Sequence, residues 1–230
     1  MTKTATCTYH FLLMNWYIFL YYYIPNIGKG EEKLKEFHDG TRWKYLTILN
    51  LLLQAVFFGV ASLDDVLKRI SGRKDIKFIT SFRDLLFATL AFPISTFVSL
   101  VFWTLFIYDR SLVYPQGLDD YFPAWTNHAM HTFIFPLSLA ELILRPHRPP
   151  SKKLGLTLLV TCILAYISSI LWRYAKTGNW VYPVFAALSP LGITVFLSAN
   201  SLLVVGIYLL GEKINQWRWG ATVKPWVKKK

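Results

Sequence analysis

The stretch LLFATLAFPISTFVSLVFWTLFIY, residues 85–108, sets the architecture of this chain, because it is long, apolar and without a single charged residue. Apolar runs of about 18 residues or more are typical of helices that cross a lipid bilayer. Comparable runs recur along the 230 residues, of which 54% are hydrophobic and only 17% charged. The pattern predicts an all-α polytopic membrane bundle that forms one domain over residues 1–230.

We expect about six transmembrane helices. The six apolar segments that predict them are Tyr9–Ile24, Trp43–Ala61, Leu85–Tyr108, Phe122–Leu144, Leu154–Trp172 and Val181–Leu210. The fourth segment contains Pro136 and several polar residues, so a re-entrant path is the alternative for it. The sixth contains Pro183 and Pro190 and is long enough to tilt or to contain a break.

The basic residues predict the orientation. Of the 25 Lys and Arg residues, 17 fall at the N-terminus, in the second and fourth loops and at the C-terminus, and eight fall in the other loops. This bias predicts that both termini are cytoplasmic and that residues 211–230 form a basic cytoplasmic tail. The net charge of +12 therefore reflects short membrane loops, and without a nucleic-acid motif it indicates no nucleic-acid partner.

Polar side chains inside apolar segments are costly and usually face a bundle interior or a cavity. The second segment carries Thr47, Asn50 and Gln54, whose spacings of three and four residues place them on one helical face. A threonine in such a place usually bonds to helix backbone, so Thr47 alone does not indicate catalysis.

The fourth segment carries the rarer side chains. Asn127 and His131 are four residues apart and share a face, and His128 lies close to that face. Glu141 precedes Arg145 by four residues, the favourable order for a helical ion pair, and this pair is interpreted as structural.

Thr47 and His131 lie at similar depths. Both segments start at the outer side, and a rise of about 1.5 Å per residue places both side chains in the outer half of the bilayer. A neutral imidazole can take the proton from a hydroxyl that attacks an ester carbonyl. Asn50 and Asn127 are candidate oxyanion donors, and His128 is a candidate contact near the pair. No carboxylate is evident at this depth, which favours a dyad over a triad.

A metal site is the competing interpretation of His128 and His131. A zinc or iron site needs at least a third protein ligand. The other histidines, His10, His38 and His147, fall at other depths or in loops. We therefore predict no metal and no other cofactor.

Several longer motifs stand out along the chain. They are RWKYLTILNLLLQ (42–54), LDDVLKR (63–69), FRDLLFATLAFPISTFV (82–98), NHAMHTFIFP (127–136), ILRPHRPPSKK (143–153) and GNWVYPVF (178–185). Together these motifs resemble the androgen-induced-gene family of multi-pass membrane proteins. The resemblance covers essentially the whole chain.

The resemblance implies an activity. Members of this family hydrolyse fatty acid esters of hydroxy fatty acids with an essential threonine and histidine, which match Thr47 and His131 here. It further implies a lipid substrate taken from the bilayer, residence in the cell membrane including caveolae, and a link to tissue factor pathway inhibitor and coagulation. The alternative is a non-catalytic membrane scaffold that regulates tissue factor pathway inhibitor, in which the polar faces are helix–helix contacts.

Overall fold

A computed structural model describes residues 3–27, 41–72, 76–114 and 116–221, and these residues form helices and connecting turns with no strand among them. The α-helices are α1 (Lys3–Tyr23), α3 (Leu46–Ile70), α4 (Lys77–Leu86), α5 (Phe92–Asp109), α6 (Ala124–His131), α7 (Ile134–Leu144), α8 (Lys152–Thr177), α9 (Pro183–Ala187) and α10 (Pro190–Trp219). The shorter turns are η1 (Ile24–Asn26), η3 (Thr41–Lys44), η4 (Phe87–Ala91), η5 (Arg110–Leu112) and η6 (Gln116–Leu118). The predicted all-α bundle is confirmed.

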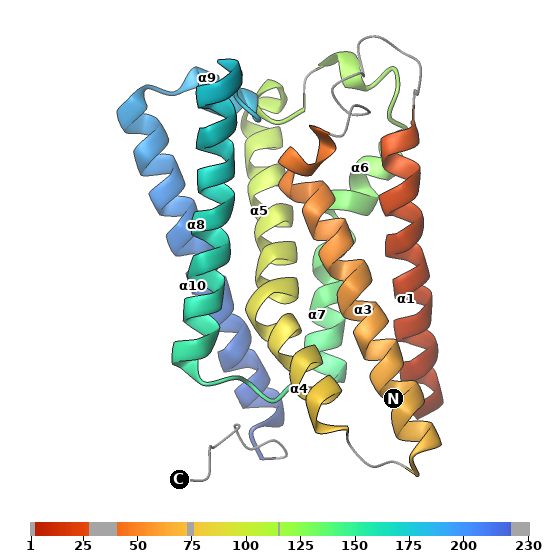
Figure 1. The fold of residues 1–230 in the computed structure, drawn as a ribbon. Coiled ribbons are helices and arrows are strands. Elements are labelled where there is room, and N and C mark those ends of the chain that lie inside the picture. Colours follow the sequence, from red (N-terminus) through yellow and green to blue (C-terminus); the bar gives the residue numbers. More distant parts are fainter. Residues whose placement is uncertain (1–2, 28–40, 73–75, 115, 222–230) are drawn as a thin grey trace.

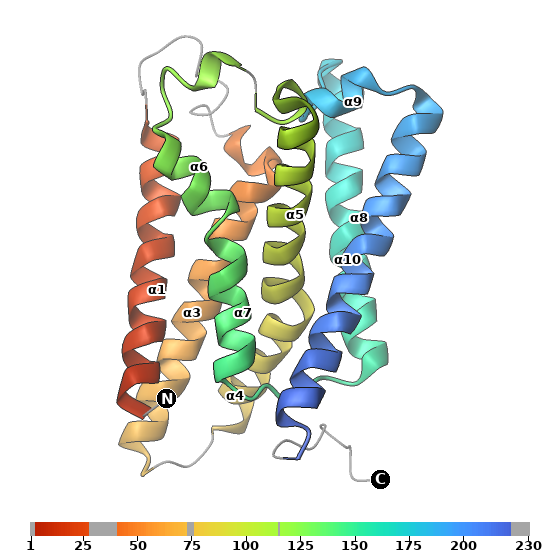
Figure 2. The ribbon, with the colours of Figure 1, turned by 180° about the vertical axis from the view of Figure 1, so that it is seen from behind.

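The helices stand side by side around α5 (Figure 1). Helix α1 packs along α3 on one side, and α8 and α10 form the opposite side. Seen from behind, the short α6 stands above α7 and leans across the bundle (Figure 2). The start of α1 and the end of α10 lie at the same end of the molecule in both views. We call this end the terminal end and the other the loop end.

Four helices among the described residues are long and apolar enough to cross a membrane. They are α3, the continuous helix Lys77–Leu112, α8 and α10. They correspond to the second, third, fifth and sixth predicted segments. Helix α1 and the α6–α7 pair do not meet the same criterion, so the count of six and the cytoplasmic placement of the termini remain predictions.

The fourth predicted segment is not one continuous helix. Helix α6 ends at His131 and α7 begins at Ile134. Pro136 explains the interruption, because it has no N–H to bond the carbonyl of Thr132 four residues earlier. The Phe133 N–H instead donates to the His128 carbonyl at 2.9 Å. The break places His131 at a helix end inside the bundle.

The sixth predicted segment contains the break that its prolines suggested. Pro183 begins the one-turn helix α9, and Ser189 caps α10, in which Pro190 takes the first position. Helix α10 then continues to Trp219, so the first nine residues of the predicted 211–230 tail are helical, while the cytoplasmic tail itself stays a prediction. Residues 211–219 are helical because they pack in the bundle, whereas 222–230 lie outside the described residues.

The third segment contains a π-helical turn, η4, just before Pro93. Pro93 lacks an N–H, which loosens the hydrogen-bond ladder one turn earlier. The Gln54 side chain from α3 contacts this turn, since its Nε2 donates to the Ala91 carbonyl at 2.9 Å. Gln54 is therefore a contact that holds α3 against the irregular turn.

Candidate active site

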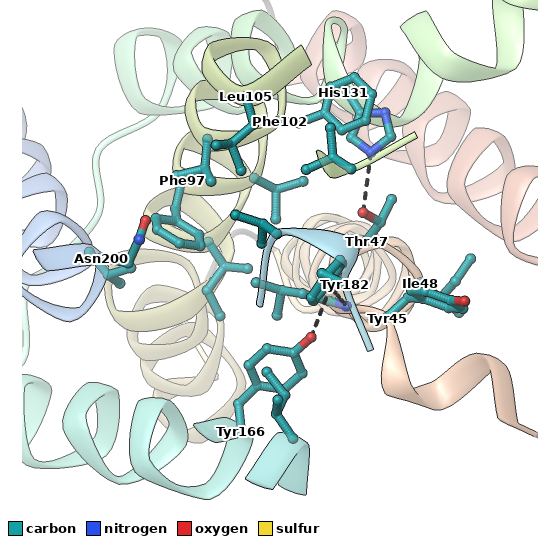
Figure 3. A pocket seen from close by; sticks show the side chains of 18 of the residues that line it. Tyr45, Thr47, Ile48, Phe97, Phe102, Leu105, His131, Tyr166, Tyr182 and Asn200 are labelled. Carbon is teal, nitrogen blue, oxygen red and sulfur yellow. Dashed lines mark hydrogen bonds between the residues drawn. The ribbon is translucent and has the colours of Figure 1, made fainter. Parts of the chain in front are cut away.

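Thr47 and His131 meet at the loop end of the bundle. Tyr45 is extended and caps α3, so Thr47 lies in the first turn of that helix. His131 is the last residue of α6. The Thr47 Oγ1 and His131 Nε2 atoms are 3.2 Å apart, within hydrogen-bond distance (Figure 3). The predicted contact between the two side chains is confirmed, whereas their catalytic roles stay predictions.

Asn127 decides which nitrogen of His131 carries the proton. The Nδ1 atom of His131 lies 2.6 Å from Asn127 Oδ1 and 3.1 Å from the Asn127 backbone carbonyl. A carbonyl oxygen can only accept, so Nδ1 must be the donor. In the neutral ring Nε2 then carries the lone pair, and it faces the Thr47 hydroxyl. Asn127 therefore accepts the Nδ1–H hydrogen bond of the imidazole through its side-chain oxygen, and this contact orients the ring.

The His131 ring is held on its face as well as at its edge. Phe102 of α5 stacks on it with ring centroids 3.5 Å apart and an angle of 5° between the planes. His131 itself is buried. Because the ring is fixed by Asn127 and Phe102 together, its Nε2 points to Thr47 without further ordering.

The pair lines an apolar cavity of about 270 Å³ that is only partly enclosed. Its wall is built from α3, α5, α6, α8, α9 and α10, and runs from the pair toward the middle of the bundle (Figure 3). Leu159, Ile163 and Ile170 of α8 and Phe196 and Val204 of α10 belong to that wall. Such a lining suits an alkyl chain.

Two tyrosines in the cavity wall fix the start of α3. The Leu46 N–H donates to the Tyr182 hydroxyl at 2.9 Å, and the Tyr166 hydroxyl donates to the Lys44 carbonyl at 2.9 Å. The two hydroxyls are also 2.9 Å apart (Figure 3). Because the Tyr166 proton goes to Lys44, Tyr182 is the donor between them. This chain of bonds positions the turn that carries Thr47, and the sequence analysis missed it.

Asn50 does not line the cavity. Its Oδ1 accepts from Gln54 Nε2 at 3.1 Å, and its Nδ2 is buried without a partner among the described residues. The structure therefore places Asn50 inside the helix packing, one turn along α3 from Thr47. The assignment of Asn50 as an oxyanion donor finds no support in this geometry.

His128 lies outside the cavity. It is exposed, its Nδ1 is 3.0 Å from the Thr132 hydroxyl, and it stacks with Trp103 at 5.4 Å between centroids. It contacts neither Thr47 nor a second metal-ligating side chain, and no group of three such side chains is arranged around a metal position in the described ranges.

Comparisons with known proteins identify the family of this chain. The profile of the FAR-17a/AIG1-like protein family matches residues 5–216. The chain belongs to this family. The rat and human proteins named "Androgen-dependent TFPI-regulating protein" are 76% and 62% identical to this FAR-17a/AIG1-like chain over the full length of each. The human "Androgen-induced gene 1 protein" is 40% identical over 78% of the chain and 79% of its own length. No solved structure matches the chain.

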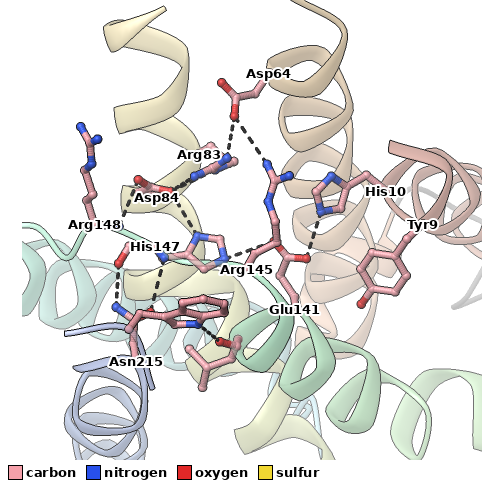
Figure 4. A network of polar contacts seen from close by, with 12 residues as sticks. Tyr9, His10, Asp64, Arg83, Asp84, Glu141, Arg145, His147, Arg148 and Asn215 are labelled. Atoms are coloured by element: carbon pink, nitrogen blue, oxygen red, sulfur yellow. Dashed lines mark hydrogen bonds and ion pairs between the residues drawn. The ribbon is translucent and has the colours of Figure 1, made fainter. Parts of the chain in front are cut away.

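This FAR-17a/AIG1-like protein also holds a buried polar cluster at the terminal end, distinct from the Thr47–His131 pair (Figure 4). Glu141 of α7 is its centre and is fully buried. One carboxylate oxygen lies 3.0 Å from His10 Nε2, and the other lies 3.1 Å from His147 Nε2. The remaining ring nitrogens face Asp65 at 2.7 Å and Asp84 at 3.1 Å.

The expected Glu141–Arg145 pair is wrong. Arg145 instead lies 2.8 Å from Asp65 of α3, because the helix ends at Leu144 and the arginine leaves the helical face. Each imidazole in the cluster has a carboxylate at both nitrogens, so both nitrogens must donate for every contact to be a hydrogen bond. The FAR-17a/AIG1-like bundle thus closes its terminal end with a compact charge network.

Proposed function

We propose that this protein is an intramembrane hydrolase that cleaves the ester bond of fatty acid esters of hydroxy fatty acids. Thr47 is the nucleophile and His131 is the general base in this proposal. The observation that carries it is the contact between Thr47 Oγ1 and the unprotonated nitrogen of His131 in the wall of an apolar cavity. An activated hydroxyl next to a site for alkyl chains is what lipid ester hydrolysis requires.

The reaction has two halves. Thr47 Oγ1 attacks the ester carbonyl while His131 Nε2 takes its proton, and the imidazolium returns that proton to the departing hydroxy fatty acid. Water then attacks the acyl-threonine, giving its proton to His131, and the fatty acid leaves as the Thr47 hydroxyl is restored. Asn127 holds Nδ1–H in both halves, as the third member does in other nucleophile–histidine sites.

The negative charge that develops on the ester carbonyl oxygen during the attack needs hydrogen-bond donors to stabilise it. The first N–H groups of a helix have no partner within that helix and carry partial positive charge. The N–H of Thr47 itself is one of these and lies on the residue that attacks. This assignment replaces Asn50 and Asn127, whose side chains are directed elsewhere.

The decisive experiment replaces the hydroxyl with a methyl group of the same shape. Thr47→Val is expected to lower hydrolysis at least 1,000-fold, the order of loss seen when a nucleophile is removed, without changing the amount of folded protein. Thr194→Val is the matched control, because Thr194 is exposed and bonds its own helix carbonyl. The wild-type protein should also be labelled by a fluorophosphonate at Thr47, mapped by mass spectrometry. Retained turnover in Thr47→Val, or a label on another residue, contradicts the mechanism.

The second candidate is regulation of tissue factor pathway inhibitor at the cell membrane, including caveolae, without catalysis. The observation in its favour is the name "Androgen-dependent TFPI-regulating protein", which belongs to relatives that are 62–76% identical over the whole chain. Endothelial cells that express Thr47→Val distinguish the two. Unchanged secretion of the inhibitor would show that regulation does not need hydrolysis. A loss of secretion equal to that of cells without the protein would show that regulation depends on Thr47.

A further inference from the structure

A second pocket opens at the loop end, beside the catalytic cavity. It is more open than the first. The residues that line it are Trp43, Lys44, Ser169, Ile170, Trp172, Arg173, Lys176, Thr177 and Val181. Three of these are basic and none is acidic, and two tryptophans flank them. Tryptophan and basic side chains in this combination are typical of the boundary between lipid and water.

Arg173 and Lys176 carry positive charge where the chain is accessible, since Arg173 is partly exposed and Lys176 is exposed. Within the part of the chain that the structure describes, neither side chain forms an ion pair with a carboxylate. The Lys176 ammonium lies over the Trp172 ring, 4.9 Å from its centroid. Elsewhere at this end Arg110 is paired with Asp119 at 2.6 Å. The pocket therefore offers positive charge to an anion that comes from outside the chain.

The two pockets are adjacent. Ile170 lines both of them. Tyr166 of the catalytic cavity donates its hydroxyl proton to the backbone carbonyl of Lys44, which lines the second pocket. Lys44 precedes Thr47 by three residues, and three residues of extended chain reach at most about 11 Å. A single lipid molecule can therefore touch both sites.

The membrane places the carboxylate and the ester of such a lipid at different depths. A carboxylate costs several kcal/mol in the hydrocarbon region and stays at the interface, whereas an ester enters the apolar region more readily. We propose that the second pocket binds the anionic group of the substrate, through Arg173 and Lys176, and so selects esters whose alcohol half ends in a free carboxylate. This inference rests on the proposed hydrolase function and adds its substrate specificity.

The test compares two substrates in neutral phosphatidylcholine vesicles that contain the full-length protein. They are the palmitoyl ester of a hydroxystearic acid and the methyl ester of the same compound, which lacks the negative charge. The variant Arg173→Gln/Lys176→Gln is expected to raise KM for the free acid about tenfold, because charge-assisted hydrogen bonds are lost. It should change KM for the methyl ester less than twofold and leave kcat unchanged for both.

The matched control is Lys152→Gln/Lys153→Gln, which removes two exposed charges at the other end of the same helix. It should change KM and kcat for neither substrate. Equal effects of Arg173→Gln/Lys176→Gln on both substrates, or no effect on either, overturn the inference while hydrolysis still stands. An effect that requires added anionic phosphatidylglycerol would assign the pocket to a phospholipid phosphate and also overturn it. Wild-type protein that cleaves neither ester contradicts the hydrolase itself.

Discussion

Contacts at both ring nitrogens and at the ring face fix the orientation of the His131 imidazole. Asn127 fixes its Nδ1–H, Phe102 fixes its ring plane, and Thr47 occupies the remaining nitrogen. The sequence placed Asn127 and His131 on one face because they are four residues apart. It could not tell whether the amide would face an oxyanion or the imidazole, since that depends on where α6 ends and what α3 brings to it.

Substitutions at Asn127 test whether this residue orients the His131 imidazole or only fills space beside it. Asn127→Leu removes the side-chain acceptor and lets the imidazole turn, so kcat should fall about 100-fold, the order expected for a reacting group displaced by about 1 Å. Asn127→Asp keeps an acceptor, and its charge stabilises the imidazolium. The acid limb of the pH–rate profile should then move to higher pH, because the base form appears later as pH rises.

The control for this series is Asn15→Leu, since Asn15 is exposed and bonds only its own helix. Its kcat and pH profile should match the wild type. If Asn127→Asp is as inactive as Asn127→Leu and its profile does not move, Asn127 has only a packing role.

Residues far apart in sequence were the ones that sequence reasoning missed. His10 and Glu141 are in contact across 131 positions, and Glu141 and His147 meet only because the chain turns after Leu144. Each looked like an isolated polar residue near a helix end. Charged residues gathered at the ends of predicted segments, such as Asp64 and Asp65, were the one available signal.

At the scale of the elements, the long apolar segments were predictable and their interruptions only partly so. Proline marked every irregularity: Pro93 follows the π-turn, Pro136 follows the α6–α7 break, and Pro190 begins α10. A proline in an apolar run does not reveal whether the helix bends, breaks or continues. That choice depends on partners such as Gln54, which satisfies a carbonyl from another helix.

The packing of α10 on α5 depends on one glycine. A Cβ at Gly211 would lie 2.7 Å from two ring carbons of Phe92, which is itself buried. Gly211→Ala should therefore destabilise the protein by about 1–3 kcal/mol, as overpacking of a core does. Gly206→Ala on the same helix is the matched control, because nothing lies within 4 Å of its Cβ.

Thermal unfolding in detergent checks this prediction. Gly211→Ala should lower Tm, whereas Gly206→Ala should leave it unchanged or raise it slightly through the higher helix propensity of alanine. Equal Tm values for the two variants would mean that α10 does not depend on its close approach to Phe92.

For the whole molecule, the charge network joins four helices and a connecting segment at the terminal end. It takes side chains from α1, α3, α4 and α7 and from the segment before α8 (Figure 4). Glu141→Gln should cost about 3–5 kcal/mol of stability, because it removes the buried carboxylate that His10 and His147 share. Asp119→Asn, in a pair that is partly exposed, should cost less than about 1 kcal/mol.

The measurement is again Tm, read together with fluorophosphonate labelling of the folded fraction below Tm. Glu141→Gln should melt earlier yet still label at Thr47, since the network and the Thr47–His131 pair lie at opposite ends. Equal stability of Glu141→Gln and Asp119→Asn would show that the network does not hold the bundle together.

The orientation in the membrane can be tested at the two ends of α8. Lys152 and Lys176 are exposed near opposite ends of α8. In a protein with Cys7 and Cys162 replaced by serine, Lys176→Cys should react with a membrane-impermeant maleimide on intact cells. Lys152→Cys should react only after permeabilisation, because the positive-inside bias assigns its end to the cytoplasm. The reverse pattern would invert the topology.

The thin wall formed by α8 and α10 has a kinetic consequence. Only 17% of the apolar stretch of each helix is buried inside the protein, against 50% for α3, and both helices line the cavity. In the proposed hydrolase, an ester that comes from the bilayer and enters past these helices would not pass through bulk water. The turnover rate should then follow the mole fraction of ester in the bilayer, and diluting the ester with inert phospholipid should slow hydrolysis even when its amount per millilitre stays constant.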